Sequence, residues 1–140
     1  MYRTVTVRSV ARATGLCCTL FFTPMLHAQS PADAVVERLL TEPIPEYAGH
    51  ELSMLTVTYP PGGSSKPHRH DAYILVYVLE GAVEMQVQGG PLRTVRAGET
   101  FVEHPADIHE VSRNASKTRP AKIVAVLISD KGQELVLPPT

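Results

Sequence analysis

From residue 52 onward, apolar and polar residues alternate in short runs that turn residues separate. In the run 55–59, Leu55, Val57 and Tyr59 share one face, because successive side chains of a strand point to opposite faces. Turn signals such as PPGG, EG and GGP stand between the runs. Strands are expected at 55–59, 72–79, 82–88, 92–96, 100–103, 109–113, 121–129 and 134–137. Short strands without a long amphipathic helix predict an all-β antiparallel sandwich or barrel.

The segment before these strands, residues 30–51, supports two interpretations. Ser30 and Pro31 are suited to the N-cap and first turn of a helix. Pro43 and Pro45 forbid any continuation of that helix. The segment is therefore either a short helix or an extended arm that ends in a proline-rich linker.

The first 28 residues have the layout of a secretory signal peptide. Arginines stand at positions 3, 8 and 12, and an apolar stretch, 15–26, follows. The stretch is shorter than the roughly 20 residues that span a bilayer, and Ala28 supplies a small residue before a cut. We expect cleavage after Ala28, a secreted or periplasmic protein and no stable membrane insertion. The expected domains are 1–28 signal peptide, 29–51 N-terminal arm or linker, and 52–140 barrel.

Charge and cysteine content argue against two classes of function, nucleic-acid binding and thiol chemistry. The chain has 13 Lys and Arg against 14 Asp and Glu. Cleavage after residue 28 removes three arginines and no acid, which leaves a net charge near -4. No basic stripe is present, so nucleic acid is not expected as a partner. Cys17 and Cys18 both lie in the predicted signal peptide, so the mature chain has no disulfide and no thiol ligand or nucleophile.

Two histidines, His68 and His70, stand one residue apart before an apolar run. Strand residues i and i+2 share a face, so both imidazoles can converge on one point. Imidazole is a common ligand of divalent metals. An isolated pair of this kind is more often exposed and polar, but here Gly62 precedes the pair by six residues and Gly81 follows it by eleven. A second glycine-led segment supplies His109.

These spacings resemble the cupin superfamily, whose first motif reads G, five residues, H-X-H, three or four residues, E, six residues, G. Its second motif reads G, five residues, P-X-G, two residues, H, three residues, N. Gly98 and His109 fit the second motif. His104 stands where the motif has proline, Ala106 where it has glycine, and Asn114 one residue late.

The resemblance spans roughly residues 52 to 130 and implies a double-stranded β-helix, the jelly-roll barrel of cupins. It also implies a divalent transition metal held by His68, His70 and His109. Neutral histidines suit Fe, Mn, Ni, Cu or Zn, and ligand type alone does not choose among them. Cupins commonly dimerise through their sheets, so a homodimer is expected by resemblance.

The main departure from the family is a missing carboxylate. The motif's glutamate would fall at position 74 or 75, where this chain has Ile74 and Leu75. Losing that carboxylate should leave the site one charge more positive, with one more open coordination position, which favours an anionic ligand. If Phe101 faces inward, then Glu103 does too. Glu103 is then a fourth metal ligand, a partner of a ligand histidine or a catalytic general base, unless it is a solvated rim residue.

Weaker candidates receive structural roles. We expect His104 at the rim and His50 solvated in the linker. Asp107 is expected to take a left-handed conformation in its turn. Tyr73, Tyr77 and Met85 are expected to line or fill the barrel, and Arg113 with Asn114 to stabilise the turn after their strand.

Two functions fit best. The first is a secreted or periplasmic metal-dependent enzyme, a dioxygenase or an isomerase, that acts on a small molecule at the three histidines. The alternative is a binding module that captures a small ligand without turnover. A third interpretation, a site that has lost its function, is disfavoured because buried polar groups are costly to keep.

Overall fold

The computed structural model describes residues 32–140, and within them the chain forms ten strands and no helix. The predicted signal peptide lies outside these residues. No helix in the described part is long and apolar enough to cross a membrane. The strands are β1 (Val35–Pro43), β2 (His50–Tyr59), β3 (Ser64–Ser65), β4 (His68–Arg69), β5 (Ala72–Glu80), β6 (Ala82–Val87), β7 (Arg93–Arg96), β8 (Thr100–Glu103), β9 (Ile108–Asn114) and β10 (Ala121–Asp130).

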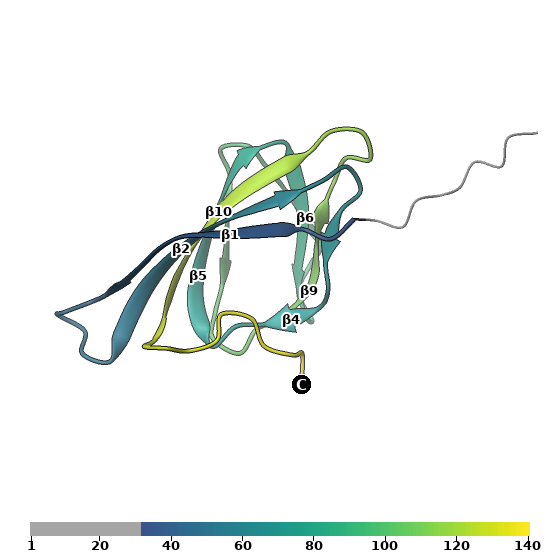
Figure 1. Ribbon diagram of the computed structural model, residues 1–140. Coiled ribbons are helices and arrows are strands. Elements are labelled where there is room, and N and C mark those ends of the chain that lie inside the picture. Colours follow the sequence, from purple (N-terminus) through teal and green to yellow (C-terminus); the bar gives the residue numbers. More distant parts are fainter. Residues whose placement is uncertain (1–31) are drawn as a thin grey trace, which may run out of the picture.

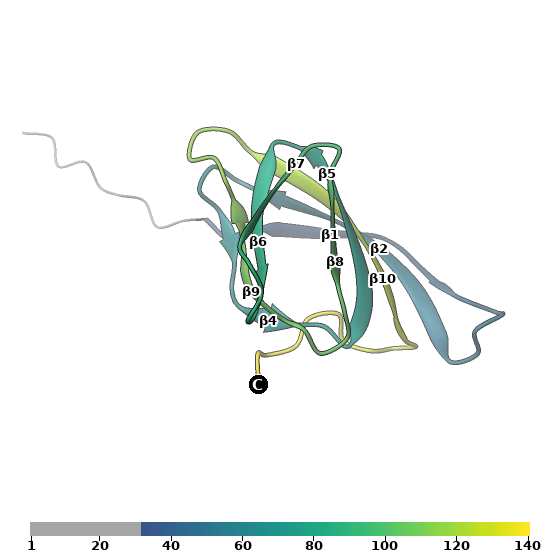
Figure 2. The same cartoon turned by 180° about the vertical axis from the view of Figure 1, so that it is seen from behind.

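Two antiparallel sheets face each other across the core, which confirms the expected jelly-roll barrel (Figure 1). One sheet has the order β1-β2-β10-β5-β8, and the other the order β3-β9-β6-β7, with β4 also paired to β9. Figure 2 shows the second sheet from behind, with β6 and β9 opposite β5 and β10. The end of the barrel that carries β4 also carries the C-terminal segment.

The N-terminal segment is extended, so the helical interpretation of 30–42 is wrong for the part described. β1 pairs with β2 along its length, with a bulge between Arg38 and Leu40. Pairing with β2 stabilises the extended segment, whereas a short helix without such packing is only marginally stable in water. Pro43 is tolerated because β1 is an edge strand and its outer side needs no donor. His50 is the first residue of β2 rather than part of a linker.

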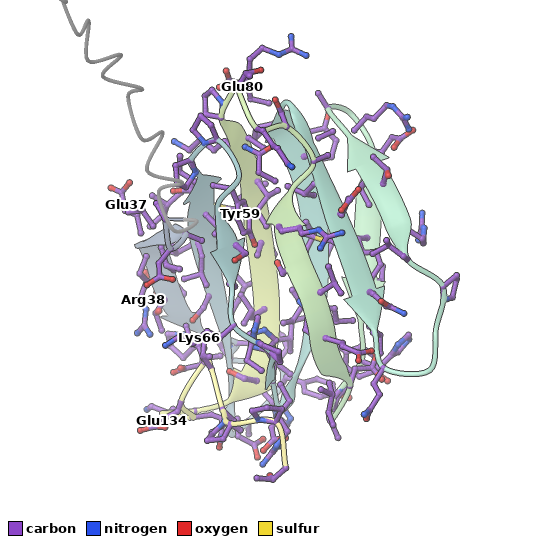
Figure 3. All side chains as sticks on the ribbon, turned by 90° about the vertical axis from the view of Figure 1, so that its right-hand side faces the viewer. Glu37, Arg38, Tyr59, Lys66, Glu80 and Glu134 are labelled. Atoms are coloured by element: carbon purple, nitrogen blue, oxygen red, sulfur yellow. The ribbon has the colours of Figure 1, made fainter. Side chains whose placement is uncertain are left out.

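Inward-facing side chains of both sheets make one apolar core. Burial alternates along β5 and β10, as expected for strands with one face on the core. Leu55, Val57 and Tyr59 all face inward, as their spacing predicts. Figure 3 shows the charged side chains Glu37 and Glu80 at the periphery of the barrel and Tyr59 nearer its centre.

Two expectations about strands and faces are wrong, and two short strands were not expected. The expected strand 134–137 is wrong, because only Leu137 forms a bridge, to Arg69. Tyr73 and Tyr77 do not line the barrel; they point outward from β5 and are 57% and 43% exposed. Met85 is fully buried in the core, as expected. β3 and β4 are two residues each, too short for a hydrophobic pattern to reveal.

Candidate metal centre

Three histidines meet at the β4 end of the barrel: His68 lies on β4, His109 on β9, and His70 between β4 and β5. His68 on β4 pairs in register with His109 on β9, so their side chains leave the sheet side by side. His70 follows two residues later and is 8% exposed. One ring nitrogen of each histidine lies within 4.8 Å of the others. The structure thus brings together all three histidines that the sequence analysis selected.

The contacts of His68 fix which of its nitrogens is free. Its Nδ1 lies 2.7 Å from the backbone oxygen of Lys66. A carbonyl oxygen only accepts, so Nδ1 carries the hydrogen and donates it, and the neutral ring keeps its lone pair on Nε2. Burial lowers the pKa of His68, partly opposed by this hydrogen bond, and so favours the neutral form that binds metal.

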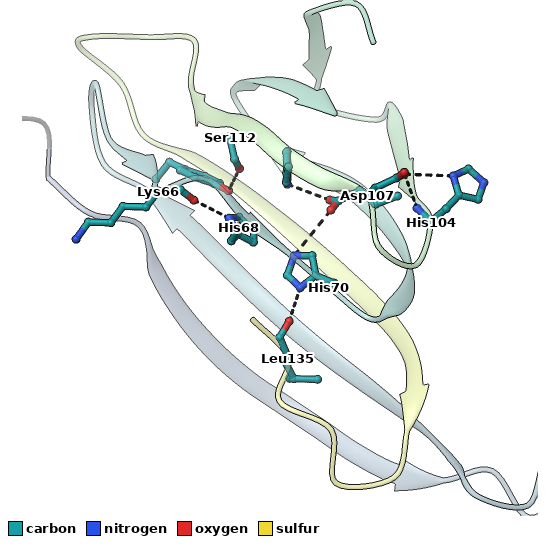
Figure 4. Close-up of polar contacts among 10 residues, drawn as sticks. Lys66, His68, His70, His104, Asp107, Ser112 and Leu135 are labelled. Carbon is teal, nitrogen blue, oxygen red and sulfur yellow. Dashed lines mark hydrogen bonds and ion pairs between the residues drawn. The ribbon is translucent and has the colours of Figure 1, made fainter. Parts of the chain in front are cut away.

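The C-terminal segment orients His70 in the same way. His70 Nδ1 donates to the backbone oxygen of Leu135 (Figure 4). Two backbone hydrogen bonds hold that segment beside β4, from Arg69 N to Leu137 O at 3.0 Å and from Leu137 N to Arg69 O at 2.9 Å. His70 therefore also presents Nε2 to the site.

His109 is oriented by a carboxylate and a ring. Its Nδ1 lies 3.2 Å from Glu103 Oε1, in a contact that is almost fully buried. The Phe101 ring stacks on its imidazole, with centroids 5.9 Å apart and planes at 15°. His109 Nε2 is buried without a hydrogen-bond partner. A buried nitrogen lone pair without a donor is costly unless something else, such as a cation, takes it up.

Glu103 faces inward from β8, as its alternation with Phe101 predicts, and is 3% exposed. It is not one of the three residues whose ligand atoms cluster. Its second oxygen, Oε2, lies 3.8 Å from His70 Nε2 and has no hydrogen-bond partner. Glu103 is also the register partner of Ile74 on β5. The carboxylate therefore stands one strand away from the position where the cupin motif would place it.

A strained turn between β8 and β9 holds the backbone of His70. Ala106 has a φ of 68° and is the sole non-glycine residue with positive φ in residues 32–140. Its N–H donates to the His70 oxygen at 3.0 Å. The expectation of a left-handed Asp107 is wrong; Asp107 Oδ2 instead accepts from His104 N at 2.8 Å. Ala106 occupies the motif's glycine position, where positive φ costs a side chain roughly 1–2 kcal/mol. His104 is exposed at the rim, as expected.

Asn114 ties the far end of β9 to the loops beside it, which confirms its turn role. Its side-chain amide donates to the backbone oxygens of Tyr59, Pro60 and Arg119. Arg113 does not share that role, because it pairs with Glu84 on the exposed face of β6 at 2.6 Å.

This fold and these histidines agree with a family match. A family model described as "Cupin domain" matches residues 55–127. The chain belongs to the cupin family. The match includes β4, β8 and β9, which carry His68, Glu103 and His109, and the connection after β4 that carries His70.

The sequence of this cupin is similar to part of a longer plant protein. It is 31% identical over 83 residues to germin-like protein subfamily 2 member 4 of Arabidopsis thaliana, covering 56% of this chain and 37% of the relative. This cupin thus spans little more than a third of that relative's length.

Solved structures share the fold of this chain. An oxalate oxidase in complex with glycolate is 28% identical with a TM-score of 0.58, covering 78% of this chain and 56% of that one. A double-stranded β-helix protein from Klebsiella pneumoniae is 16% identical with a TM-score of 0.61, covering 78% and 88%, which shows the fold alone.

The histidines open onto a cavity of about 570 Å³ inside the barrel. Ile74 lines it and is 3% exposed, whereas Leu75 points outward, so Ile74 is the residue that faces the site from the motif's carboxylate position. Most of the lining is apolar. Its apolar side chains include those of Leu55, Val57, Val76, Met85, Ile123 and Leu127.

Sequence reasoning missed two contributions to this centre. The carbonyls of Lys66 and Leu135 orient two histidines, and a backbone atom leaves no signal in the residue type. The sequence also gave no reason to select a buried hydroxyl pair, Tyr59 with Ser112. The inward position of Tyr59 was predictable from its alternation, but its partner is 53 residues away.

Proposed function

We propose that this cupin is a secreted or periplasmic metal-dependent enzyme, a dioxygenase or an isomerase, that acts on a small oxygen-bearing molecule. One observation carries the proposal. The Nδ1 atoms of His68, His70 and His109 all face oxygen acceptors, so the three Nε2 atoms are left for one ion. The buried Nε2 of His109, without a hydrogen-bond partner, fits such an ion directly.

Three neutral imidazoles suit Fe, Mn, Ni, Cu or Zn, and Glu103 is a further candidate ligand. When bound, such an ion supplies Lewis acidity and, if it is redox-active, a centre for dioxygen chemistry. The similarity to oxalate oxidase supports an oxidoreductase on small oxygen-bearing molecules.

The chain's own residues have distinct tasks in this proposal. The apolar cavity walls keep water from a bound ligand and strengthen electrostatic contacts at the histidines. Glu103 Oε1 holds the His109 ring, while the unpaired Oε2 is placed to accept a proton from a ligand bound beside His70. Glu103 thus supplies the carboxylate that Ile74 lacks, but from β8 rather than from position 74. A divalent ion with one nearby carboxylate retains a net positive charge, which favours an anionic ligand.

Metal binding tests the proposal first. We expect the mature protein to bind one equivalent of at least one of the five ions, measured by calorimetry and by metal analysis after dialysis. His109→Ala should lower that affinity by roughly 100-fold or more, since a lost ligand exceeds the 10- to 100-fold effects of residues behind a ligand. His104→Ala, at the exposed rim, is the matched control and should bind as the wild type does. No stoichiometric metal in the wild type would overturn the proposal.

Turnover is tested separately with the metal-loaded protein. Oxygen consumption and product formation are followed with dicarbonyl compounds, catechols and short 2-hydroxy acids. We expect at least one class to be consumed or rearranged. Saturable binding without turnover across the panel would favour a small-ligand-binding module instead.

Secretion and dimerisation remain proposals with their own tests. We expect protein recovered from the periplasm or medium to begin at residue 29, which N-terminal sequencing would show. A homodimer is supported by the exposed apolar side chains of β5, Leu75 and Leu79 among them, on the outside of the barrel. Light scattering should give the mass of a dimer for the wild type and the mass of a monomer for Leu75→Glu.

A further inference from the structure

The cavity holds a second polar group, away from the histidines. Tyr59 Oη and Ser112 Oγ are 2.6 Å apart and both residues line the cavity. Their exposed fractions are 2% and 4%. Ser65, the register partner of Ser112, also lines the cavity. The cavity therefore contains a buried cluster of hydroxyls that the proposed metal site does not use.

The strand register fixes where this cluster lies. Ser65 pairs with Ser112, and three residues further along the same two segments His68 pairs with His109. At about 3.3 Å per strand residue, the two pairs are roughly 10 Å apart along β9. The hydroxyls and the histidines thus mark two separated points on one wall of the cavity.

Between these points the cavity offers a ligand mainly apolar contacts. Val57, Val76 and Met85 line it together with inward residues of β10. Among its lining residues within 32–140, the charged side chains apart from the histidines are Asp33, Lys66 and Glu103. Asp33 and Lys66 are exposed. The buried wall near Tyr59 consequently offers no cation to a second negative charge.

The hydroxyl cluster is a neutral donor and acceptor. In the Tyr59–Ser112 hydrogen bond one hydroxyl donates to the other, so one hydrogen and several acceptor positions remain. Burial raises the pKa of Tyr59, which keeps the phenol protonated. Such a cluster suits a hydroxyl, carbonyl or amide group and penalises a carboxylate.

We propose that the cavity binds an elongated monoanion whose metal-binding carboxylate or enolate lies at the three histidines. Its apolar body of about four to six carbons follows the wall, and an uncharged hydrogen-bonding group reaches Tyr59 and Ser112. This inference rests on the proposed function and narrows its substrate class. Small diacids lack the apolar body, and longer diacids would bury an unpaired charge.

The test uses calorimetric binding to the full-length mature protein loaded with Zn(II), with three probes of equal chain length. We expect 6-hydroxyhexanoate to bind about 3- to 10-fold more tightly than hexanoate, the range of one buried hydrogen bond. Hexanedioate should bind at least 10-fold more weakly than 6-hydroxyhexanoate. Acetate should be weaker than hexanoate, since it fills none of the apolar wall.

Tyr59→Phe and Ser112→Ala identify the distal contact. Each should bring the ratio between 6-hydroxyhexanoate and hexanoate close to one while leaving zinc affinity unchanged. Tyr77→Phe, on the outer face, is the control and should keep the wild-type ratio. The second variant keeps the test valid if one of the two fails to fold.

The outcomes separate the two proposals. A wild type that does not bind zinc or any of the other ions overturns both the proposed function and this inference. A wild type that binds metal but prefers hexanedioate or acetate overturns the inference alone. The inference alone is also overturned if Tyr59→Phe and Ser112→Ala both keep the wild-type preference for 6-hydroxyhexanoate over hexanoate.

Discussion

The two walls of the cavity differ in what they contribute. The wall from β2, β5 and β10 consists of strands of nine or ten residues, and its inward side chains are mostly apolar. The wall from β3, β4 and β9 supplies His68, His109 and Ser112. One sheet thus shapes the cavity, and the other provides most of its chemistry.

The difference follows from strand length and regularity. Long, regular strands satisfy their backbone groups in the ladder, which leaves no carbonyl for a side chain. β3 and β4 have two residues each, so the Lys66 carbonyl between them is free to orient His68. A shift in register between Gln86 and Val87 interrupts the β6–β9 pairing beside His109. The candidate metal ligands therefore lie where the strand pairing is short or irregular.

The largest predicted effect comes from putting a charge into the apolar wall. Ile74→Glu should lower the free energy of unfolding of the metal-free protein by about 3 kcal/mol or more at neutral pH, because the introduced carboxylate is buried opposite Glu103. Urea denaturation measures the change, and added metal should restore part of it. Leu92→Glu, at an exposed position before β7, should cost far less. Equal losses in the two variants would contradict the inward role of position 74.

Removing volume from the same wall should affect stability alone. Leu127→Ala deletes a side chain that is 1% exposed, and we expect a loss of about 2–4 kcal/mol. Metal affinity should change by less than threefold, because no ligand moves. Ile128→Ala, its exposed neighbour, should cost about 1 kcal/mol or less. A collapse of metal affinity in Leu127→Ala would show that the two walls are not independent.

The histidine site is tested through Glu103, which reaches His109 from β8 of the other sheet. Glu103→Gln should weaken metal affinity about 10-fold, because an amide holds the His109 ring less strongly than a carboxylate does. Calorimetry gives the affinity, and Glu110→Gln on the exposed side of β9 is the control. Unchanged affinity with lost turnover would assign Glu103 to proton transfer. No change in either would leave it without a role.

The smallest predicted effect concerns Tyr59 at alkaline pH. Burial raises the pKa of Tyr59 above its usual value of 10.0, so the unfolded chain loses this proton at a lower pH than the folded chain does. The stabilisation from keeping the phenol neutral is fully present below pH 10 and is lost as pH rises through the folded pKa. The wild type should therefore lose more stability than Tyr59→Phe between pH 9 and 11, as thermal melts would show. Tyr77→Phe should follow the wild type; parallel curves for all three would refute the shift.

Most strands were predictable, because alternation reflects a local rule about which face a side chain takes. The runs 72–79, 100–103 and 121–129 appear as β5, β8 and β10 with small changes at their ends. The faces of Tyr73 and Tyr77 were not predictable in the same way. An apolar outer face and an apolar inner face look alike in β5, and only packing against the second sheet decides between them.

The candidate metal centre was likewise predictable in part from the sequence. The sequence by itself indicated that His68 and His70 can converge and that Glu103 faces inward if Phe101 does, and the cupin motif added His109 as their third member. Only the tertiary structure decided that Glu103 lies against His109, that Leu135 orients His70, and that Ala106 takes the left-handed turn. These contacts join segments distant along the chain, often through backbone atoms, and a local pattern of residue types cannot specify them.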